Sequence, residues 1–318
     1  MARVFTADEI IALARDIGKI PNTSATGSED SDLLKLLNDY LQTTIAPAIM
    51  SVREGYFDRQ YRTALSATTS TYRVNPRALL GCERDIRYVN SDGTRSPPLD
   101  QISPGDVDMV QDSQSASKPT GFYMEGNYIK LIPTMGSDAS GYLEEVFPMR
   151  PSELVLVTNT RRVSSVSGTT ITLTAAVPSG WDTDDTFDIH SKYSGAELKC
   201  WDKAAGTVSG TTIITSTDID GTLTGEFAVE AGDYVCLSGE CAVPAVPYEF
   251  HQVLARAIAA EFAESLGDSE SAKLHSDRLT MRMKLLLDAL KPRVSGKKKR
   301  HKKSPLISAQ GRGRVTAQ

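Results

Sequence analysis

Four aspartates lie within a short stretch of the sequence, at Asp182, Asp184, Asp185 and Asp188. Carboxylate oxygens grouped in this way could ligate a hard cation such as calcium. The stretch has neither the turn glycine nor the terminal glutamate of a calcium-binding loop, which makes calcium binding the less favoured interpretation. We therefore predict no metal site here.

The other side chains that could do chemistry are few and scattered. Cys82, Cys200, Cys236 and Cys241 form no CxxC pair, so free thiols on strands are expected, with Cys236 and Cys241 paired across a turn as the alternative. His251 lies on the first turns of a predicted helix and is expected to be a surface or interface group, not a general base. Phosphate-loop, GxSxG, HExxH and Rossmann motifs do not occur. The sequence predicts a protein that is not an enzyme and has neither a cofactor nor a small-molecule substrate.

The strongest binding signal is the charge of the C-terminal segment. Residues 291–318 contain ten of the 35 Lys and Arg residues and no Asp or Glu. Residues 1–290 therefore hold 25 basic against 40 acidic residues, a charge of −15, while the segment carries +10. It has too few apolar groups to offset the roughly 1–2 kcal/mol of backbone entropy that each ordered residue loses. We expect residues 293–318 to be an extended arm that a partner orders, with a solvated, disordered end as the alternative.

The arm could bind nucleic-acid phosphates or an acidic protein surface, or it could serve solubility alone. No aromatic residues interleave with the lysines to stack on bases, so sequence-specific recognition is disfavoured. Leu306 and Ile307 give the arm a short apolar anchor that suits a groove on a protein. The candidate binding residues are Arg293, Lys297, Lys298, Lys299, Arg300, Lys302, Lys303, Leu306, Ile307, Arg312 and Arg314.

Helical spacing of apolar residues defines the two ends of the folded part. A capping box at Thr6 and Glu9 predicts a helix over 7–17, and a second helix starts near Asp32, restarts at Pro47 and continues to about Ala67. Near the C-terminus, residues 247–266 and 269–290 form a predicted hairpin of two helices. Gly267 ends the first helix in the left-handed conformation, and Asp268 or Ser269 caps the second.

The middle of the chain is rich in strand signals. Strands are expected at 68–72, 80–89, 143–147 and 154–157, with a turn at 90–93 and a hairpin around Gly126. Residues 166–171 recur as 208–213, each copy with a Ser-Gly turn between Thr/Val/Ile-rich arms. Each copy precedes another strand signal, at 186–189 and 232–235. These patterns predict a small all-β module over 158–245, either a sandwich or an open barrel.

The predicted fold class is therefore α+β. Residues 1–157 supply N-terminal helices and strands, 158–245 an inserted all-β module, 246–292 the C-terminal helical hairpin that completes the body, and 293–318 the basic arm. No apolar run approaches the ~18 residues of a membrane span, and the N-terminus lacks the order of a signal peptide. A cytosolic product that makes no membrane contact is expected.

Several segments, in order along nearly the whole chain, resemble the head-to-tail adaptor proteins (connector, or head-completion, proteins) of tailed bacteriophages. These segments are residues 72–78, 118–133, 143–155, 247–251, 266–268 and 290–293. The resemblance implies a structural protein of the virion that is assembled in the host cytoplasm and occupies the head-tail junction. It implies a ring, commonly of twelve copies, which binds the portal protein through C-terminal arms and receives tail proteins on its other side.

The acidic body also suits a conduit for passing genomic DNA, because a like-charged wall does not grip phosphates. Two other classes of function compete with the adaptor. One is a nucleic-acid-binding protein that uses the basic C-terminal tail. The other is an enzyme or carbohydrate-binding module built on residues 158–245.

Overall fold

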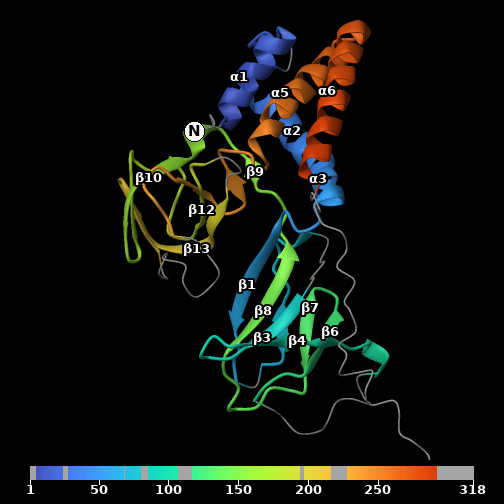
Figure 1. The fold of residues 1–318 in the computed structure, drawn as a ribbon. Coiled ribbons are helices and arrows are strands. Elements are labelled where there is room, and N and C mark those ends of the chain that lie inside the picture. Colours follow the sequence, from blue (N-terminus) through green and yellow to red (C-terminus); the bar gives the residue numbers. More distant parts are fainter. Residues whose placement is uncertain are drawn as a thin grey trace, which may run out of the picture.

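The structure is a computed structural model that describes residues 5–23, 28–67, 69–79, 85–106, 117–193, 197–215 and 228–291. It is a mixed α+β protein, as predicted (Figure 1). Helices from both ends of the chain lie together, and the described strands between them form two four-stranded sheets, a closed barrel and a short two-stranded ladder. Within these ranges, no helix combines the length and apolar character needed to cross a membrane.

The helical part has a single core to which both ends of the chain contribute. Its helices are α1 (Ala7–Gly18), α2 (Asp30–Tyr40), α3 (Ala46–Val52), α5 (Tyr248–Ser265) and α6 (Ser269–Leu290). The predicted capping box of α1 is confirmed, since Thr6 Oγ1 accepts a hydrogen bond from the Glu9 N–H and Glu9 Oε2 accepts one from the Thr6 N–H. Ile10, Leu37 and Phe250 are buried together in this core.

The second predicted helix is correct at its start and wrong at its end. A π-helical stretch, Leu41–Ile45, separates α2 from α3, and Pro47 lies in the first turn of α3, which confirms the predicted restart. The predicted continuation to about Ala67 is wrong, because residues Asp58–Ala64 form strand β1. All seven residues of β1 pair with β8, and these pairings outweigh the helical spacing of the local sequence.

Two four-stranded sheets enclose a second core. One has the order β1-β8-β3-β4, with β8 (Tyr142–Pro148), β3 (Asp85–Val89) and β4 (Arg95–Pro98). The other has the order β2-β7-β6-β5, with β2 (Thr71–Arg73), β7 (Tyr128–Ile132), β6 (Gly121–Glu125) and β5 (Asp100–Gln101). The predicted hairpin is confirmed as β6-β7, where Gly126 has φ +59°. The predicted turn at 90–93 joins β3 to β4, and residues 80–84 of the predicted strand lie outside the described residues.

The repeated sequence forms two hairpins, β10-β11 and β13-β14, of a closed barrel with the strand order β10-β11-β14-β13-β12-β15. Its strands are β10 (Arg161–Ser167), β11 (Thr170–Leu173), β12 (Thr186–His190), β13 (Leu198–Ser209), β14 (Thr212–Thr215) and β15 (Tyr234–Leu237). Gly168 and Gly210 take φ of +57° and +56° in the turns of the two copies, and Ile171 of one copy pairs with Ile213 of the other. The module is thus a barrel, one of the two predicted alternatives, but the barrel is closed and not open.

A short parallel ladder joins the barrel to the helices. It pairs β16 (Glu240–Cys241) with β9 (Glu153–Leu154), so only the first residue of the predicted strand 154–157 belongs to a strand. Val157 begins a 3-10 turn, and its N–H donates to Asp8 of α1. The N–H of Ala7 in turn donates to the carbonyl of Ala242. The start of α1 is therefore fixed to the segment that leaves the barrel.

Candidate interaction surface on the C-terminal helical hairpin

The candidate binding residues of the arm, Arg293, Lys297, Lys298, Lys299, Arg300, Lys302, Lys303, Leu306, Ile307, Arg312 and Arg314, all lie outside the described residues. The structure does describe the helical hairpin from which this segment continues. Helix α6 ends at Leu290, and Lys291 is its C-terminal flanking residue.

The hairpin forms as the sequence predicts. Gly267 has φ +74°, a conformation that glycine adopts without strain from a Cβ. Asp268 Oδ1 accepts a hydrogen bond from the N–H of Ser271, so Asp268 caps α6. Helix α5 then packs deeply into the helical core, where Val253, Leu254 and Ile258 are buried.

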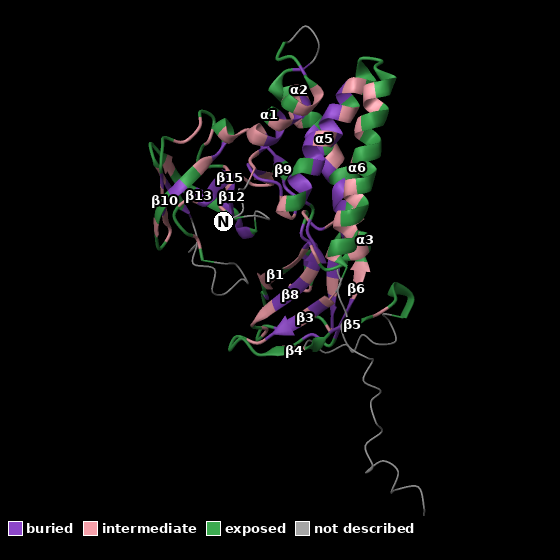
Figure 2. Ribbon diagram, turned by 45° about the horizontal axis from the view of Figure 1, so that its top comes forward, coloured by how far each residue is buried: buried purple, intermediate pink, exposed green. Residues whose placement is uncertain are grey.

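Helix α6 is packed on one side only. None of its residues is buried, whereas nine residues of α5 are (Figure 2). The residues of α6 that rest against the core are half-buried or partly exposed: Leu279, Met283, Leu286, Leu287 and Leu290. Met281 and Leu285 point outward and are 63% and 64% exposed. A long helix with apolar side chains on its outer face is typical of a surface that binds another protein.

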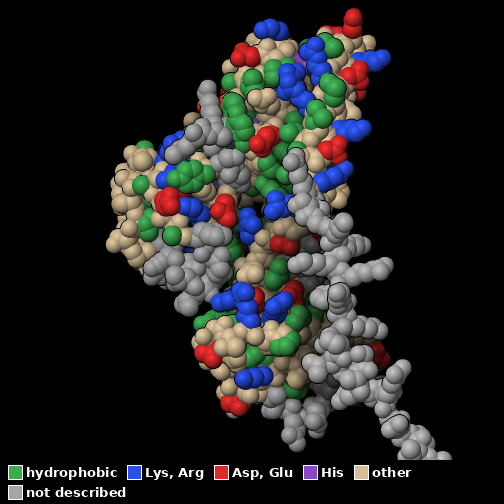
Figure 3. Space-filling model, in the orientation of Figure 1, with side chains coloured by type: hydrophobic (Ala, Val, Ile, Leu, Met, Phe, Trp, Pro, Cys, Tyr) green, Lys and Arg blue, Asp and Glu red, His purple; other side chains and the backbone are tan. Residues whose placement is uncertain are grey.

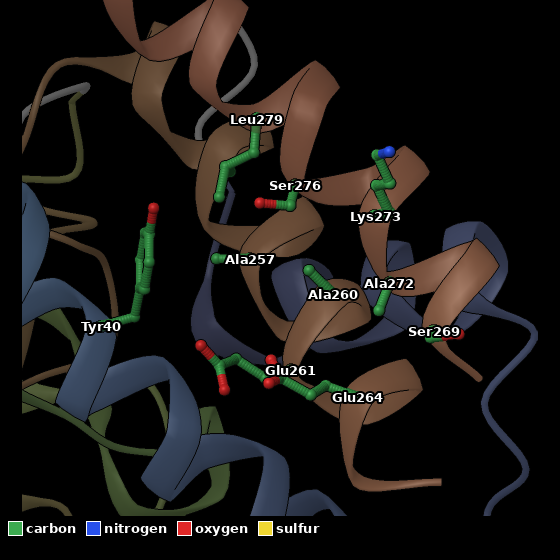
Figure 4. Close-up of a pocket in the computed structure, with 10 residues that line it drawn as sticks. All are labelled: Tyr40, Ala257, Ala260, Glu261, Glu264, Ser269, Ala272, Lys273, Ser276 and Leu279. Atoms are coloured by element: carbon green, nitrogen blue, oxygen red, sulfur yellow. The ribbon is translucent and has the colours of Figure 1, made fainter. Parts of the chain in front are cut away.

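A groove runs along one side of α6. Its first section, of about 320 Å³, lies between the end of α5 and the start of α6, with Tyr40 of α2 at its edge. Figure 4 shows Glu261 and Glu264 of α5 on one side of this space and Ser276 and Leu279 of α6 on the other. Burial, and then the nearby charge of Glu261, raises the pKa of Tyr40. A second section of about 500 Å³ shares Tyr40 and Leu279 and continues toward the end of α6.

A separate groove of about 270 Å³ lies between the start of α5 and the second half of α6. Its lining is mainly apolar and aromatic, and Glu249, Gln252 and Arg282 supply its polar groups. Arg282 Nη1 donates to Oε1 of Gln252 at 3.3 Å. The guanidinium of Arg282 therefore lies at the border between this groove and the basic side chains further along the hairpin.

Those basic side chains form a cluster that sequence reasoning missed, consisting of Arg256 of α5 with His275, Arg278 and Arg282 of α6. Figure 3 shows Lys and Arg side chains gathered over this part of the helices. Burial, then the positive charges of Arg282 and Arg278, lowers the pKa of Arg256. Burial, then Arg256 and Arg278, lowers the pKa of His275, and the charge of Asp268 opposes this. The available signal was the spacing of residues 275, 278 and 282, which places them on one face of a helix.

A different polar network ties the barrel to the sheets. Arg77 Nη1 lies 2.6 Å from Asp188 Oδ2, and Arg77 Nη2 donates to the hydroxyl of Ser152 at 3.1 Å. Asp188 is fully buried and also accepts from the N–H groups of Asp202 and Gly239. The guanidinium of Arg77 and the backbone N–H groups compensate the buried carboxylate of Asp188, so we assign the network a structural role.

The aspartates first considered as cation ligands do not converge on one point. Asp185 Oδ2 accepts from the N–H of Asp182, and Asp182 Oδ1 accepts from the N–H of Asp184, so these carboxylates hold their own loop. Asp188 faces Arg77 instead. Within the described ranges, no three His, Cys, Asp or Glu side chains are grouped closely enough to hold a metal ion.

The expectation that His251 is a surface or interface group is wrong, because its side chain is buried inside this chain. It is fully buried, because Phe5 and Tyr248 pack against its ring where α5 leaves the barrel. Burial lowers its pKa to about 4, against the opposing effect of the Val246 and Pro244 carbonyls. Cys236 and Cys241 are free, buried thiols on strands, as expected. Cys200 is also buried on a strand, and Cys82 lies outside the described residues.

No protein-family model matches this chain, and no curated protein matches it significantly.

Proposed function

We propose that this chain is a non-enzymatic structural protein of the virion, a head-to-tail adaptor of a tailed bacteriophage. Copies join in a ring, commonly of twelve, beneath the portal protein at the head-tail junction. An extended basic arm, residues 293–318, attaches each copy to the portal, and tail proteins bind the other side of the ring. The passing genomic DNA is not recognised by sequence.

The observation that carries this proposal is the incomplete packing of α6. A helix with no buried residue, with outward Met281 and Leu285 and with grooves on both sides, is suited to contact a neighbouring protein. The basic arm continues from the end of this helix. The charge of −15 on residues 1–290 is compatible with a DNA conduit, since it does not attract phosphates.

The proposal is tested by imaging the purified chain mixed with the portal of its phage. We expect rings attached to portals, and we expect a chain without residues 294–318 to stay folded and fail to attach. The isolated chain is expected to be largely monomeric in ultracentrifugation, with the ring forming on the portal. An arm-deleted chain that attaches with unchanged affinity would show that residues 294–318 are only a solvated end.

Two sets of substitutions separate the contributions within the arm. Charge reversal at residues 297–303 should slow association and flatten its dependence on salt, because exposed charges are screened beyond about 8–10 Å near physiological ionic strength. Replacing Leu306 and Ile307 with serine should instead speed dissociation, by losing on the order of 1.5–3 kcal/mol for each side chain that becomes buried. If both sets of substitutions changed the association and dissociation rates in the same way, the charges and the apolar anchor would not have separate roles.

The charge of +10 on residues 291–318 favours one alternative, a nucleic-acid-binding protein that uses this tail. Tight, strongly salt-dependent binding of duplex DNA by the purified chain, with no attachment to portals, would favour that alternative over the adaptor.

A further inference from the structure

The cluster of Arg256, His275, Arg278 and Arg282 brings three positive charges together beside an imidazole, and repulsion between these charges opposes folding. His275, Arg278 and Arg282 come from successive turns of α6, and Arg256 approaches them from α5. The charges of Arg278 and Arg282 lower the pKa of Arg256, and the charges of Arg256 and Arg278 lower the pKa of His275. The folded chain therefore holds a concentrated positive charge at this place on the hairpin.

No acidic residue of the described chain neutralises this cluster through a salt bridge. The Nε atom of Arg256 and the Nδ1 atom of His275 are buried, and neither has a hydrogen-bond partner among the described residues. Arg282 contacts the neutral amide of Gln252. Asp268, the one acid that acts on His275, caps the start of α6. The buried Nε–H of Arg256 is a donor without an acceptor, which is costly, and the exposed Arg278 beside it offers its guanidinium to a ligand with acceptor oxygens.

We propose that this cluster binds the carboxylates of an acidic protein segment, and that an apolar side chain of the same segment occupies the adjoining groove between α5 and α6. Arginine suits this role because its planar donors match a carboxylate in a bidentate arrangement. The inference does not rest on the adaptor role, since any partner with this chemistry would fit.

The surroundings of the cluster favour a protein segment over nucleic acid. The groove that begins at Arg282 is lined by Tyr248, Val253, Leu285 and Leu286, which offer apolar contact to a side chain. Glu249 lines the same groove and would repel any anionic group that entered it, so the groove suits the apolar side chain of the segment and not its carboxylates. The four basic groups are confined to one patch and do not form the extended track that a nucleic-acid backbone follows.

His275 provides a local readout of binding. In the free chain, burial and the charges of Arg256 and Arg278 lower its pKa. A carboxylate bound among these side chains would favour the protonated imidazole, so binding should raise the pKa of His275 and take up a proton. A ligand that binds only to the basic C-terminal segment, away from the cluster, should leave the pKa of His275 unchanged.

The experiment follows the His275 imidazole by NMR in the full chain, with the resonance assigned from His275→Gln. The probes are a short synthetic peptide containing glutamates and one leucine, duplex DNA of matched charge, and inorganic phosphate. We expect the peptide to raise the pKa of His275. Replacing both Arg278 and Arg282 with glutamine should weaken peptide binding by about ten-fold or more without lowering the thermal unfolding temperature.

The matched control is Lys273→Gln with Lys284→Gln, which removes the same charge from the other side of α6. The control should respond to the peptide as the unmodified chain does. A saturating peptide that leaves the pKa of His275 unchanged overturns the proposal. DNA or phosphate acting as strongly as the peptide overturns the assignment to a protein segment, and an equal loss in the control variant overturns the assignment to this cluster.

Discussion

The guanidinium of Arg77 and the carboxylate of Asp188 are 111 positions apart in the chain and lie 2.6 Å from each other. This ion pair joins the segment after β2 to barrel strand β12, and Ser152 from the segment before β9 completes it. The carbonyl of Arg77 also accepts from the N–H of Arg150. Two segments that carry the sequence resemblance, 72–78 and 143–155, thus meet at the point where the barrel contacts the sheets.

Removing one partner of this pair should be strongly destabilising. Asp188→Ala leaves the half-buried charge of Arg77 without its closest partner and should lower the free energy of unfolding by about 3–5 kcal/mol. Asp184→Ala, in the exposed loop before β12, should change it by about 0.5 kcal/mol or less. Denaturant titration of the two variants measures the difference, and equal values would show that the ion pair does not hold the barrel.

His251 should make the stability depend on pH. Its pKa falls from 6.5 to about 4 on folding, so the unfolded chain takes up a proton that the folded chain refuses. This contribution to stability is complete above pH 6.5 and should fall by up to about 3 kcal/mol as the pH decreases from 6.5 to 4. Denaturant titrations across this window should show a shallower dependence for His251→Gln than for the unmodified chain or for His275→Gln. Parallel profiles for all three would contradict the burial of His251.

Asn38 should be required for the link between α2 and β9. Its side-chain amide donates to the carbonyl of Leu154 at 2.9 Å, and its carbonyl oxygen accepts from the Leu154 N–H at 2.7 Å. Asn38→Ala leaves both buried backbone groups without these partners and should cost about 2–4 kcal/mol of stability. Thr43→Ala, an exposed position in the same helical segment, is the control and should cost much less. A loss confined to about 0.5 kcal/mol in both variants would mean that water replaces the amide.

The two sides of α6 should separate binding from stability. Replacing outward Met281 and Leu285 with serine should change the free energy of unfolding by about 0.5 kcal/mol or less and weaken attachment to the proposed portal partner. Replacing Met283 and Leu286 with serine should instead destabilise the chain by on the order of 1–3 kcal/mol, because they rest against the core. Thermal unfolding and a binding assay on both double variants test this, and unchanged attachment by the outward pair would remove α6 from the interface.

Features set by neighbouring residues could be predicted from the sequence. The cap at Thr6 depends on the nearby side chain of Glu9, and the turn at Gly267 and the two Ser-Gly turns depend on φ values that glycine tolerates. Strand β1 could not be predicted, because its conformation depends on pairing with β8, far along the chain. The burial of His251 was missed for a related reason, since Phe5, from the opposite end of the chain, packs against its ring.

The candidate surface was predictable in outline only. The two helices and the side of α6 that faces the core follow from apolar spacing, and the hairpin was expected from Gly267. The basic cluster combines Arg256 of one helix with side chains of the other, so it depends on how the helices are aligned after the turn. Helical spacing alone gives the faces of each helix but not this alignment.

Closure of the barrel governs how copies of the chain could meet. An open sheet of six strands would leave two edge strands whose N–H and C=O groups could pair with another molecule. Here β10 pairs with both β11 and β15, so the ring of described strands leaves neither edge free. Barrels packed side by side at high local concentration would therefore touch through side chains and loops. The described strands of the barrel offer no free edge at which strand addition, the usual route to fibrils, could begin.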